Sequence, residues 1–339
     1  MWHPNVTVVL CTYNRAGLLC GALDSLIRQD TRGGLSYEIV VVDDASTDAT
    51  PKVVREAIAR SPVPMRYVLG SGKGLARAQN MGIKESCAEW IAFFDDDELA
   101  EPNWLEELVA CALQAGVAVV GGAVRLDLSD EELGKLSPVC RSILGATEEG
   151  RKLGRCVRKT FPGSGNMLVK ATVFQAVGQF DEPWVRGGSD LELSLRCRRA
   201  GIEALFTPKA IIRHCVPAYR LKDSYLIWCS LRVGNNFAYR DFREWGLTRT
   251  MIACLARIAQ ASFVNVPLML LAHMLGNGAD VVGRRCLLSR AWGYLRESLY
   301  LVSPRLFSQE TYFSHLTKRS EGNAFAGSSN SAGRSNPSK

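Results

Sequence analysis

The sequence predicts an α/β protein in which a mostly parallel sheet is flanked by helices and followed by a helical C-terminal extension. Short apolar runs, typical of strands buried on both faces, alternate with amphipathic helical patterns through residues 6–126. Repeated βα units of this length favour a parallel sheet covered by helices on both faces. Residues 219–302 are heavily apolar and helical in pattern. A chain of 339 residues, 47% apolar and 22% charged, has ordinary globular composition, which excludes a mainly disordered protein.

The individual elements follow from these patterns. In the first part we expect strands at 6–11, 38–42, 65–69, 90–94 and 117–124, and helices at 18–27, 49–60, 75–86 and 102–114. After it we expect a loop-rich connection at 127–162 with a short helix near 131–136, a strand at 167–169, helices at 171–177 and 190–200, a Gly-rich loop at 186–189 and two short strands near 204 and 211. Residues 320–339 contain almost no large apolar side chains, so we expect a disordered tail.

The cysteines indicate a reducing compartment. Eleven of them are scattered from Cys11 to Cys286 without any C-x-x-C pair, which argues against a disulfide framework and against a zinc site. Several stand inside apolar runs, where a free thiol behaves as a small hydrophobe. The first residues lead directly into a strand-like run, without a basic segment or a small-residue cleavage site. We therefore expect a cytoplasmic location.

Charge is unevenly distributed along the chain. Residues 1–120 hold 10 basic and 16 acidic residues, a net −6, whereas residues 221–339 hold 15 and 7, a net +8. An acidic front suits a bound cation, and a basic rear suits phosphates or an anionic membrane surface. The apolar stretch 258–275 includes Asn265 and His273 and falls short of the ~20 apolar residues of a membrane span. We expect peripheral attachment at the inner face of the cell membrane, with a buried helical subdomain as the alternative.

Polar residues follow three of the predicted strands. In an open parallel sheet, ligands bind at the carboxyl ends of the strands. The residues expected there are Thr12 to Arg15, then Asp43 and Asp44, then Asp95, Asp96 and Asp97. Adjacent carboxylates raise one another's pKa unless a cation neutralises them, and Mg²⁺ or Mn²⁺ shared with substrate phosphate oxygens would do so. The alternative is a solvated acidic turn before the helix that begins near Pro102.

A Gly-rich segment at 70–77 leads into a predicted helix and carries Lys73 and Arg77. It is not a P-loop, because the spacing to the lysine is wrong and no Ser or Thr follows it. Backbone N–H groups and one of the two cations can still hold a diphosphate in such a loop. A surface turn is the alternative.

A series of motifs then resembles the family 2 inverting glycosyltransferases. In chain order they are VTVVLCTYNR at 6–15, EIVVVDDASTD at 38–48, GLARAQNMG at 74–82, FFDDDEL at 93–99, GSGNM at 163–167, GQFDE at 178–182, GSDLEL at 188–193 with Arg196, and IIRH at 211–214. The resemblance spans about residues 5–216 in the order of that family. It implies the GT-A architecture, a Rossmann-like and mostly parallel sheet flanked by helices.

The resemblance also implies a set of residues that bind the nucleotide-sugar donor. Thr12 and Tyr13 are expected to line the base and ribose pocket, and Asp44 is expected to contact the nucleobase. Arg77 is expected near the diphosphate. Asp95 matches the first acidic residue of the Asp-x-Asp motif, where it would contact the ribose or a metal-bound water.

Metal-binding and catalytic residues are implied in the same way. Asp97, the second acidic residue of that motif, would ligate Mg²⁺ or Mn²⁺, and His214 falls where many members have a further ligand. Asp190 occupies the position of the catalytic base, with a role as helix cap as its structural alternative. The usual Glu before that base is Ser189 here, which leaves the register of the loop and the acceptor site less defined.

These inferences divide the chain into regions and predict a reaction. The regions are 1–126 for donor binding, 127–216 for the acceptor and the base within the same GT-A domain, 217–305 for a helical, membrane-associated part, and the tail 320–339. We expect a metal-dependent inverting glycosyltransferase that moves a sugar to a hydroxyl of a lipid-linked or polysaccharide-precursor glycan. The metal would hold the charge of the leaving diphosphate, and a carboxylate would deprotonate the acceptor.

Two other functions compete with this one. A nucleotidyltransferase would share the acidic edge and the parallel sheet. A catalytically silent, membrane-associated nucleotide-sugar-binding protein would leave the work to the basic C-terminal helices, but the presence of Asp95, Asp97 and Asp190 disfavours it. Nucleic-acid binding has only net charge in its favour. The chain has no Q-x-x-R-W motif and no set of spanning helices, which disfavours a processive polysaccharide synthase.

Overall fold

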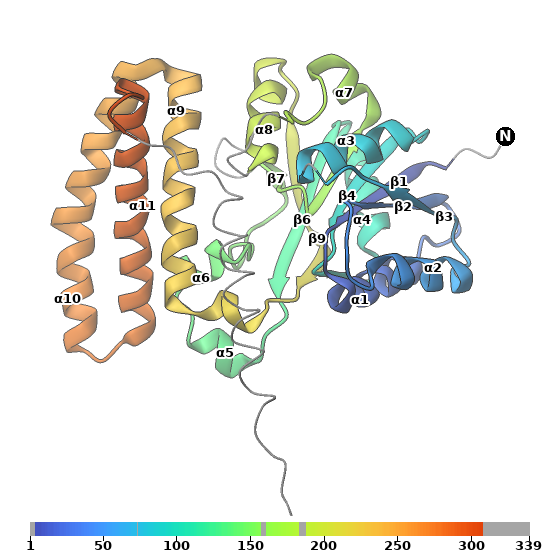
Figure 1. The fold of residues 1–339 in the computed structure, drawn as a ribbon, viewed down its shortest axis with the longest axis horizontal. Helices are drawn as coiled ribbons and strands as arrows, with labels where there is room; N and C mark the ends of the chain where they lie inside the picture. The colour runs from blue at the N-terminus through green and yellow to red at the C-terminus, as the bar shows by residue number, and fades with distance from the viewer. Residues whose placement is uncertain (1–3, 73, 157–160, 183–187, 308–339) are drawn as a thin grey trace, which may run out of the picture.

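The computed structural model describes residues 4–72, 74–156, 161–182 and 188–307. Figure 1 shows a central sheet with helices on both faces and a separate group of long helices at one end. The strands are β1 (Val6–Thr12), β2 (Tyr37–Asp43), β3 (Met65–Leu69), β4 (Trp90–Asp95), β5 (Glu98–Ala100), β6 (Val119–Leu126), β7 (Gly154–Arg155), β8 (Asn166–Lys170) and β9 (Ala204–His214).

The helices cover the sheet and then continue beyond it. Those around the sheet are α1 (Ala16–Ile27), α2 (Thr50–Arg60), α3 (Leu75–Glu85), α4 (Trp104–Ala115), α5 (Asp130–Gly134), α6 (Pro138–Ile143), α7 (Ala171–Val177) and α8 (Ser189–Arg199). Those that follow are the 3₁₀ turn η1 (Ala218–Leu221), α9 (Asp223–Gln260), the π-helical turn η2 (Ala261–Asn265), α10 (Val266–Met274) and α11 (Gly278–Val302).

The sheet has the strand order β3-β2-β1-β4-β8-β6-β9-β5, and β7 pairs with β9 beside this path. Parallel pairs join β1 to β2 and β4, β2 to β3, and β6 to β9. Antiparallel pairs are those that involve β5, β7 or β8. The predicted architecture, a mostly parallel sheet flanked by helices with a helical C-terminal region, is therefore confirmed.

One strand prediction is wrong. The two short strands expected near 204 and 211 are a single strand, β9, because a bulge around Pro208 lets the strand continue. Phe206 pairs with Gly121 of β6, and Ile211 already pairs with Ala123, so the extra residues of β9 lie in the bulge. A proline inside a strand is tolerated at such a bulge because its missing N–H breaks no ladder bond there.

The loop-rich connection after β6 contains more helix than predicted. The expected short helix is α5, which begins with a capping box formed by Ser129 and Glu132. A second short helix, α6, follows at once with Pro138 in its first turn. The predicted disordered tail at 320–339, Lys73, and residues 186–187 of the Gly-rich loop lie outside the described residues.

Alternate residues of the sheet face two separate cores. Val8 and Leu10 of β1 pack with α1, α2 and α4 on one face. Val9, between them, packs with α3, α7 and α8 on the other face. Figure 1 shows these helices on opposite sides of the sheet. Because both faces are covered, the continuous apolar runs predicted from the sequence are buried throughout.

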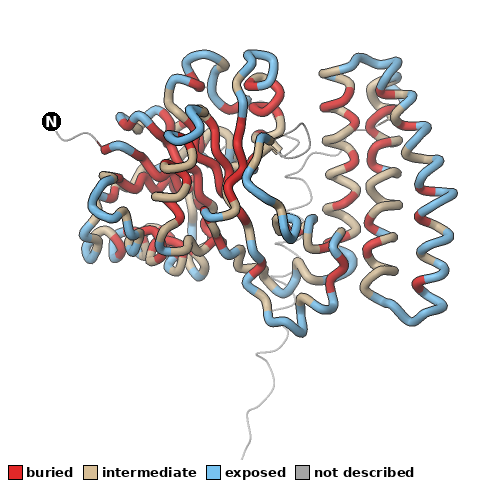
Figure 2. Tube along the Cα trace, turned by 180° about the vertical axis from the view of Figure 1, so that it is seen from behind, coloured by how far each residue is buried: buried red, intermediate tan, exposed pale blue. Residues whose placement is uncertain are grey.

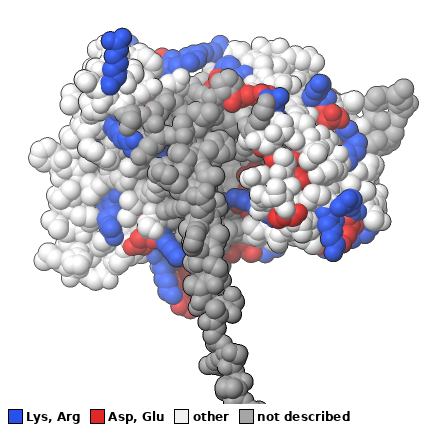
Figure 3. Space-filling model, in the orientation of Figure 1, with Lys and Arg blue, Asp and Glu red and all other residues white. Residues whose placement is uncertain are grey.

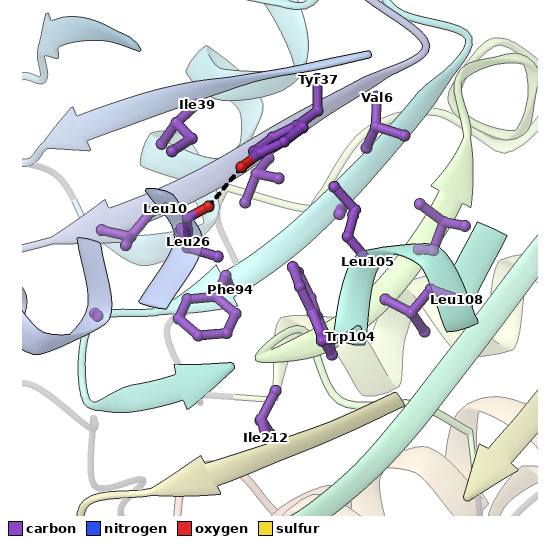
Figure 4. Packing of buried hydrophobic residues seen from close by; sticks show 14 of the residues in the cluster. Val6, Leu10, Leu26, Tyr37, Ile39, Phe94, Trp104, Leu105, Leu108 and Ile212 are labelled. Carbon is purple, nitrogen blue, oxygen red and sulfur yellow. Dashed lines mark hydrogen bonds between the residues drawn. The ribbon is translucent and has the colours of Figure 1, made fainter. Parts of the chain in front are cut away.

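Aromatic side chains fix the first core, which Figure 4 shows from close by. Trp104 of α4 is fully buried, with its ring 5.1 Å from that of Phe94 of β4. Tyr37 of β2 donates a hydrogen bond from its Oη to the carbonyl oxygen of Leu26 in α1, at 2.8 Å. These contacts hold α1 and α4 against the strands whose ends carry the site.

The helical C-terminal region consists of three long antiparallel segments (Figure 1). The first ends at Gly246 in α9, where φ is 77° and ψ is 175°, so the chain turns back there and runs on through η2 and α10. The third segment is α11. Inside the group, buried Asp241 accepts hydrogen bonds from Arg240 at 2.9 Å and from the Tyr294 hydroxyl at 2.8 Å. Figure 2 shows that the outer side of α10 is mostly exposed.

Among the described residues, one helical run, Asp223–Met274, is long and apolar enough to cross a membrane. Only 17% of its most apolar window is buried, so this part is unlike the core helix of a globular domain. The helix that carries the apolar range 258–275 begins earlier, after Gly246, and continues through the π-helical turn.

Two helical glycines should respond in opposite ways to substitution by alanine, because Gly82 in α3 packs tightly on β1 and Gly17 in α1 faces open space. A Cβ at Gly82 would lie 2.2 Å from Cγ1 of Val9, so Gly82→Ala should lower the free energy of unfolding by about 1–3 kcal/mol. A Cβ at Gly17 in α1 would meet no atom within 4 Å, so Gly17→Ala should raise it by up to about 1 kcal/mol. Urea denaturation measures both. A Gly82→Ala variant as stable as the wild type would contradict this packing.

Candidate active site

The carboxyl ends of three neighbouring strands meet at one edge of the sheet. β1 lies between β2 and β4, with Thr12 paired to Asp43 and Cys11 paired to Asp95. The acidic residues 95–98 therefore begin where β4 ends, beside the loop that follows β1. The structure thus brings together the strand ends on which the site inferred from the sequence depends.

Asp96 is held by the loop after β1. Its Oδ2 accepts a hydrogen bond from the Thr12 hydroxyl at 2.7 Å, and its Oδ1 accepts one from Nη1 of Arg15 at 2.8 Å. Burial raises the pKa of Asp96, although the Arg15 charge opposes that effect. Thr12, expected to line the base and ribose pocket, is thus buried against Asp96, whereas Tyr13 beside it is 56% exposed.

Asp97 is the most strongly neutralised carboxylate of the site. Its Oδ2 lies 2.8 Å from Nη1 of Arg15, 3.1 Å from Nη1 of Arg220 and 3.5 Å from Nε2 of His214. Burial alone would raise the pKa of Asp97, but the positive charges of Arg15 and Arg220 outweigh it and hold the pKa well below its usual range. Asp97 is therefore a permanent anion that already has cationic partners.

His214 ends β9 and points one nitrogen into the site. Its Nδ1 lies 2.8 Å from the carbonyl oxygen of Leu144, which can only accept, so Nδ1 carries the proton of the neutral ring. The lone pair of Nε2 then faces Arg220, whose Nη1 is 3.1 Å away, and Asp97. A histidine whose second nitrogen is fixed in this way is oriented as metal-binding histidines are.

Asp95 and Glu98 are the first and last residues of the acidic run, and Asp95 is half-buried whereas Glu98 is buried. Burial, followed by the charges of Asp97 and Asp96, raises the pKa of Asp95 to about 7. Burial and the charge of Asp95 raise the pKa of Glu98 as well, and its Oε2 accepts the backbone N–H of Asp95 at 3.3 Å. A Cβ at position 165 would lie 2.6 Å from Oε1 of Glu98 and 2.9 Å from Oδ2 of Asp95, so Gly165 lets the backbone close over both carboxylates.

The donor atoms of the site fit a hard divalent cation. Asp95 and Asp97 offer carboxylate oxygens, which Mg²⁺ and Mn²⁺ prefer, and His214 offers an imidazole nitrogen, which suits the transition metal Mn²⁺ better than Mg²⁺. Within the described parts of the chain, no three His, Cys, Asp or Glu side chains are assembled into a ready-made metal site. Arg15 and Arg220 already contact the Asp97 oxygen. These residues suit an ion that takes few protein ligands and completes its shell with water and phosphate oxygens.

The turn 163–165 separates Asp95 from the predicted base, Asp190. A Cβ at Gly163 would lie 3.4 Å from Oδ2 of Asp190, while the other end of the turn lies against Asp95. Asn166, which follows the turn, is fixed by hydrogen bonds of its side chain. Its Oδ1 accepts from Nε1 of Trp104 at 2.8 Å, and its Nδ2 donates to two backbone carbonyls of β6 and β9.

Asp190 lies in the first turn of α8, which begins at Ser189 after Gly188 as N-cap. It is not the N-cap, but its Oδ1 accepts the N–H of Leu191 at 2.8 Å and so satisfies one of the free donors of this helix end. Burial raises the pKa of Asp190, and backbone N–H groups, including that of Ser164, oppose the shift. Burial therefore outweighs the helix N-terminus, which by itself would favour the ionised carboxylate.

Asp44 and Arg77 have protein partners in this structure. Oδ1 of Asp44 accepts the N–H of Gly72 at 2.9 Å, and Oδ2 accepts that of Gly74 at 2.7 Å, so this carboxylate organises the Gly-rich loop. Arg77 on α3 lies 3.7 Å from Glu182, between two half-exposed side chains. The structure thus places Asp44 at the edge with Asp43, and Arg77 beside the segment that leads to α8.

Three residues of the acidic site had no individual role in the sequence-based prediction. Asp96 and Arg15 were expected only among the polar residues at the strand ends. Arg220 lies beyond the last motif, and its distance of six residues from His214 was the only available signal. All three contact the loop after β1 or Asp97, a relationship that strand spacing alone does not show.

Comparisons with known proteins agree with this architecture. The family model for glycosyl transferase family 2 matches residues 7–176. Succinoglycan biosynthesis protein ExoO of Rhizobium meliloti is 35% identical over 116 residues, which is 34% of this chain and 32% of that protein. Glycosyltransferase AglE of Haloferax volcanii is 28% identical over 246 residues, or 73% of this chain and 76% of that protein. The chain thus aligns with about a third of one relative and three quarters of the other.

Solved structures share the fold. Mannosyltransferase PcManGT of Pyrobaculum calidifontis, solved with GDP-Man and Mn²⁺, has a TM-score of 0.59 at 19% identity and covers 90% of this chain and 89% of its own. TarS 1–349 of S. aureus has a TM-score of 0.51 at 13% identity, with 89% and 92% covered. The sheet and the flanking helices are those of the GT-A fold. The chain belongs to glycosyl transferase family 2.

Proposed function

We propose that this protein is a metal-dependent inverting glycosyltransferase that transfers a sugar from a nucleotide-sugar donor to a hydroxyl of a glycan precursor, with Asp190 as the base. The observation that carries the proposal is the turn 163–165. It has the acidic edge, with Asp95, on one side and Asp190 on the other. An inverting displacement needs these two functions on opposite sides of the sugar carbon, because the nucleophile enters opposite the leaving group.

The donor would lie along the carboxyl edge of the sheet. Tyr13 is exposed there, and Asp44 holds the Gly-rich loop at the same edge by accepting the N–H groups of Gly72 and Gly74. Asp95, Asp97 and His214 would hold Mg²⁺ or Mn²⁺, with Asp95 also within reach of the ribose. When bound, the ion would act as a Lewis acid that neutralises the diphosphate. The solved complex of PcManGT with GDP-Man and Mn²⁺ supports this choice of donor and cofactor by analogy of fold.

Asp190 would accept the proton of the acceptor hydroxyl. Its raised pKa makes this carboxylate a better base than an exposed aspartate, because a base works best when its pKa approaches the operating pH. A half-buried position at the start of α8 leaves one side open for the acceptor. The acceptor class, a lipid-linked or polysaccharide-precursor glycan, is supported by ExoO, whose name places it in succinoglycan biosynthesis.

The outer face of the helical region would attach the enzyme peripherally to the inner side of the cell membrane. Between residues 250 and 277 the only Lys, Arg, Asp or Glu is Arg257, which is half-buried and paired with Asp241 at 3.6 Å. Phe263 and Met274 on that face are 81% and 82% exposed. The left margin of Figure 3, over α10, is accordingly free of charge colours for most of its height. An uncharged apolar face of this kind favours a bilayer surface.

The cationic and aromatic residues at the ends of this face are of the kinds that favour binding to a lipid surface. Exposed Arg249 and Trp245 stand at its first end, and exposed Arg285 stands near its second end, at the beginning of α11. Tryptophan prefers the interface between water and hydrocarbon, and arginine is attracted to anionic headgroups. A lipid-linked acceptor would then be presented to the site from the same surface.

Metal dependence should reside in Asp97. Asp97→Asn keeps the size of the side chain but removes the charge, so divalent-ion affinity and donor binding should fall by at least about tenfold, and transfer should fall with them. Calorimetry with Mn²⁺ and nucleoside diphosphate measures the first effect. Asp127→Asn is the matched control, because Asp127 forms an exposed pair with Arg213. Transfer by Asp97→Asn at the wild-type rate in chelator would contradict the metal role.

Asp190→Asn separates a base from a helix-terminal hydrogen-bond acceptor. Asparagine can still accept the N–H of Leu191, so the variant should fold with near-normal stability and bind donor and metal normally. Without a base, transfer should fall on the order of 10²–10⁴-fold. The product of the wild type should have the opposite anomeric configuration to the donor, as seen in the NMR coupling of the anomeric proton. Retained configuration, or unimpaired transfer by the variant, would remove Asp190 from the mechanism.

Membrane attachment should depend on the apolar face and not on exposed leucines elsewhere. The wild type should sediment with vesicles that contain anionic lipid and should be released by carbonate washing. Phe263→Asp with Leu270→Asp should abolish sedimentation, because two charges would have to enter the apolar boundary. Leu113→Asp, at a 65% exposed position on α4, is the control and should bind as the wild type does. Recovery only in detergent would indicate a true span, and absence of vesicle binding would contradict attachment.

A further inference from the structure

Arg220 occupies the place between the two side chains that would hold the metal. Its Nη1 lies 3.1 Å from Oδ2 of Asp97 and 3.1 Å from Nε2 of His214. The Arg220 side chain is only 15% exposed, and its Nε donates to the hydroxyl of Tyr219 at 3.3 Å. It belongs to the turn η1, which lies outside the region 7–176 matched by the family.

Arg15 approaches the same oxygen from the loop after β1. Its Nη1 lies 2.8 Å from Oδ2 of Asp97 and 2.8 Å from Oδ1 of Asp96. Two guanidinium groups therefore share Oδ2 of Asp97, and that of Arg220 also donates a hydrogen bond to Nε2 of His214. A divalent ion that used Asp97 and His214 would need the same lone pairs and would be repelled by both positive charges.

We propose that Arg15 and Arg220 are resident counter-cations that compete with the divalent ion for Asp97, so that the ion binds strongly only together with a diphosphate. The inference rests on the proposed metal role of Asp97 and His214. The diphosphate makes the exchange favourable in two ways. It supplies oxygen ligands to the ion, and it accepts the displaced guanidinium groups, which bind phosphate oxygens in a bidentate manner.

This arrangement has a consequence for the order of binding. Without nucleotide, the buried Asp97 is neutralised by arginine and the site has little affinity for a free ion. With nucleotide, the two guanidinium groups pair with the diphosphate, and the ion can bind the Asp97 carboxylate. Arg220 is thereby a positioning residue that links metal affinity to donor affinity. Its removal should raise the affinity for the metal without nucleotide and lower the affinity for the nucleotide.

The test measures Mn²⁺ binding without turnover, by the electron paramagnetic resonance signal of free Mn²⁺, in the absence and presence of UDP or GDP. In the wild type, one of the two nucleotides should tighten Mn²⁺ binding by about tenfold or more. Arg220→Gln removes the competing charge, so Mn²⁺ should bind about tenfold more tightly without nucleotide, and nucleotide should bind more weakly. Arg220→Met, of similar length and without polar atoms, should behave in the same way.

Arg213→Gln is the matched control. Arg213 lies on β9 beside His214 but pairs with Glu101 and Asp127 at the surface, so its removal should leave Mn²⁺ binding unchanged. Unchanged or weaker nucleotide-free Mn²⁺ binding in a folded Arg220→Gln or Arg220→Met variant overturns the inference alone. Failure of the wild type to bind Mn²⁺ with or without nucleotide overturns the metal role in the proposed function and the inference with it.

Discussion

The burial of consecutive carboxylates at the end of β4 is the constraint on which the site depends. Asp96, Asp97 and Glu98 are each at most 6% exposed, and unpaired charges at such depth would cost several kcal/mol each. The protein offsets this cost in two ways. Arg15 and Arg220 compensate Asp97, and the raised pKa of Asp95 and Glu98 keeps part of the charge off the carboxylates. A site built in this way is stable without ligands.

The side chains around Asp97 come from distant parts of the chain. Arg15 follows β1, His214 ends β9 and Arg220 lies in the turn that leads into the C-terminal helices. The acidic edge therefore connects the first strand of the sheet to the helical region. The antiparallel pairing of β5 with β9 places Glu98 opposite His214, so the end of the acidic run lies beside the end of β9. Motion of the C-terminal helices would consequently be felt at Asp97 through Arg220.

Much of the fold follows from local patterns in the sequence. The buried runs of β1 and β2 are unbroken and apolar, and the helices between them have a clear period, so this half of the sheet was predictable. Strand direction after β4 was not, because β8 and β9 differ in direction while their residues look alike. The bulge at Pro208 also has no counterpart in hydrophobic periodicity, since a proline there is equally consistent with a strand end.

The motifs predicted which residues form the site, but not how those residues are arranged in space. The sequence indicates Asp95, Asp97, Asp190 and His214, but it does not reveal that the turn 163–165 lies between Asp95 and Asp190. Nor does it reveal the contact of Arg220 with Asp97, because ion pairs between segments over a hundred residues apart leave no periodic signal. The same reason explains why the partners of Asp44 in the Gly-rich loop became visible only in the structure.

The central claim is that the acidic edge binds a nucleotide sugar through a divalent ion and releases its diphosphate. The most direct measurement is the release of nucleoside diphosphate from a panel of nucleotide sugars, with and without chelator. The account predicts that at least one donor yields nucleoside diphosphate, that chelation stops the release and that Mg²⁺ or Mn²⁺ restores it. Exchange of pyrophosphate into a nucleoside triphosphate, or release that continues at the same rate in chelator, would contradict it.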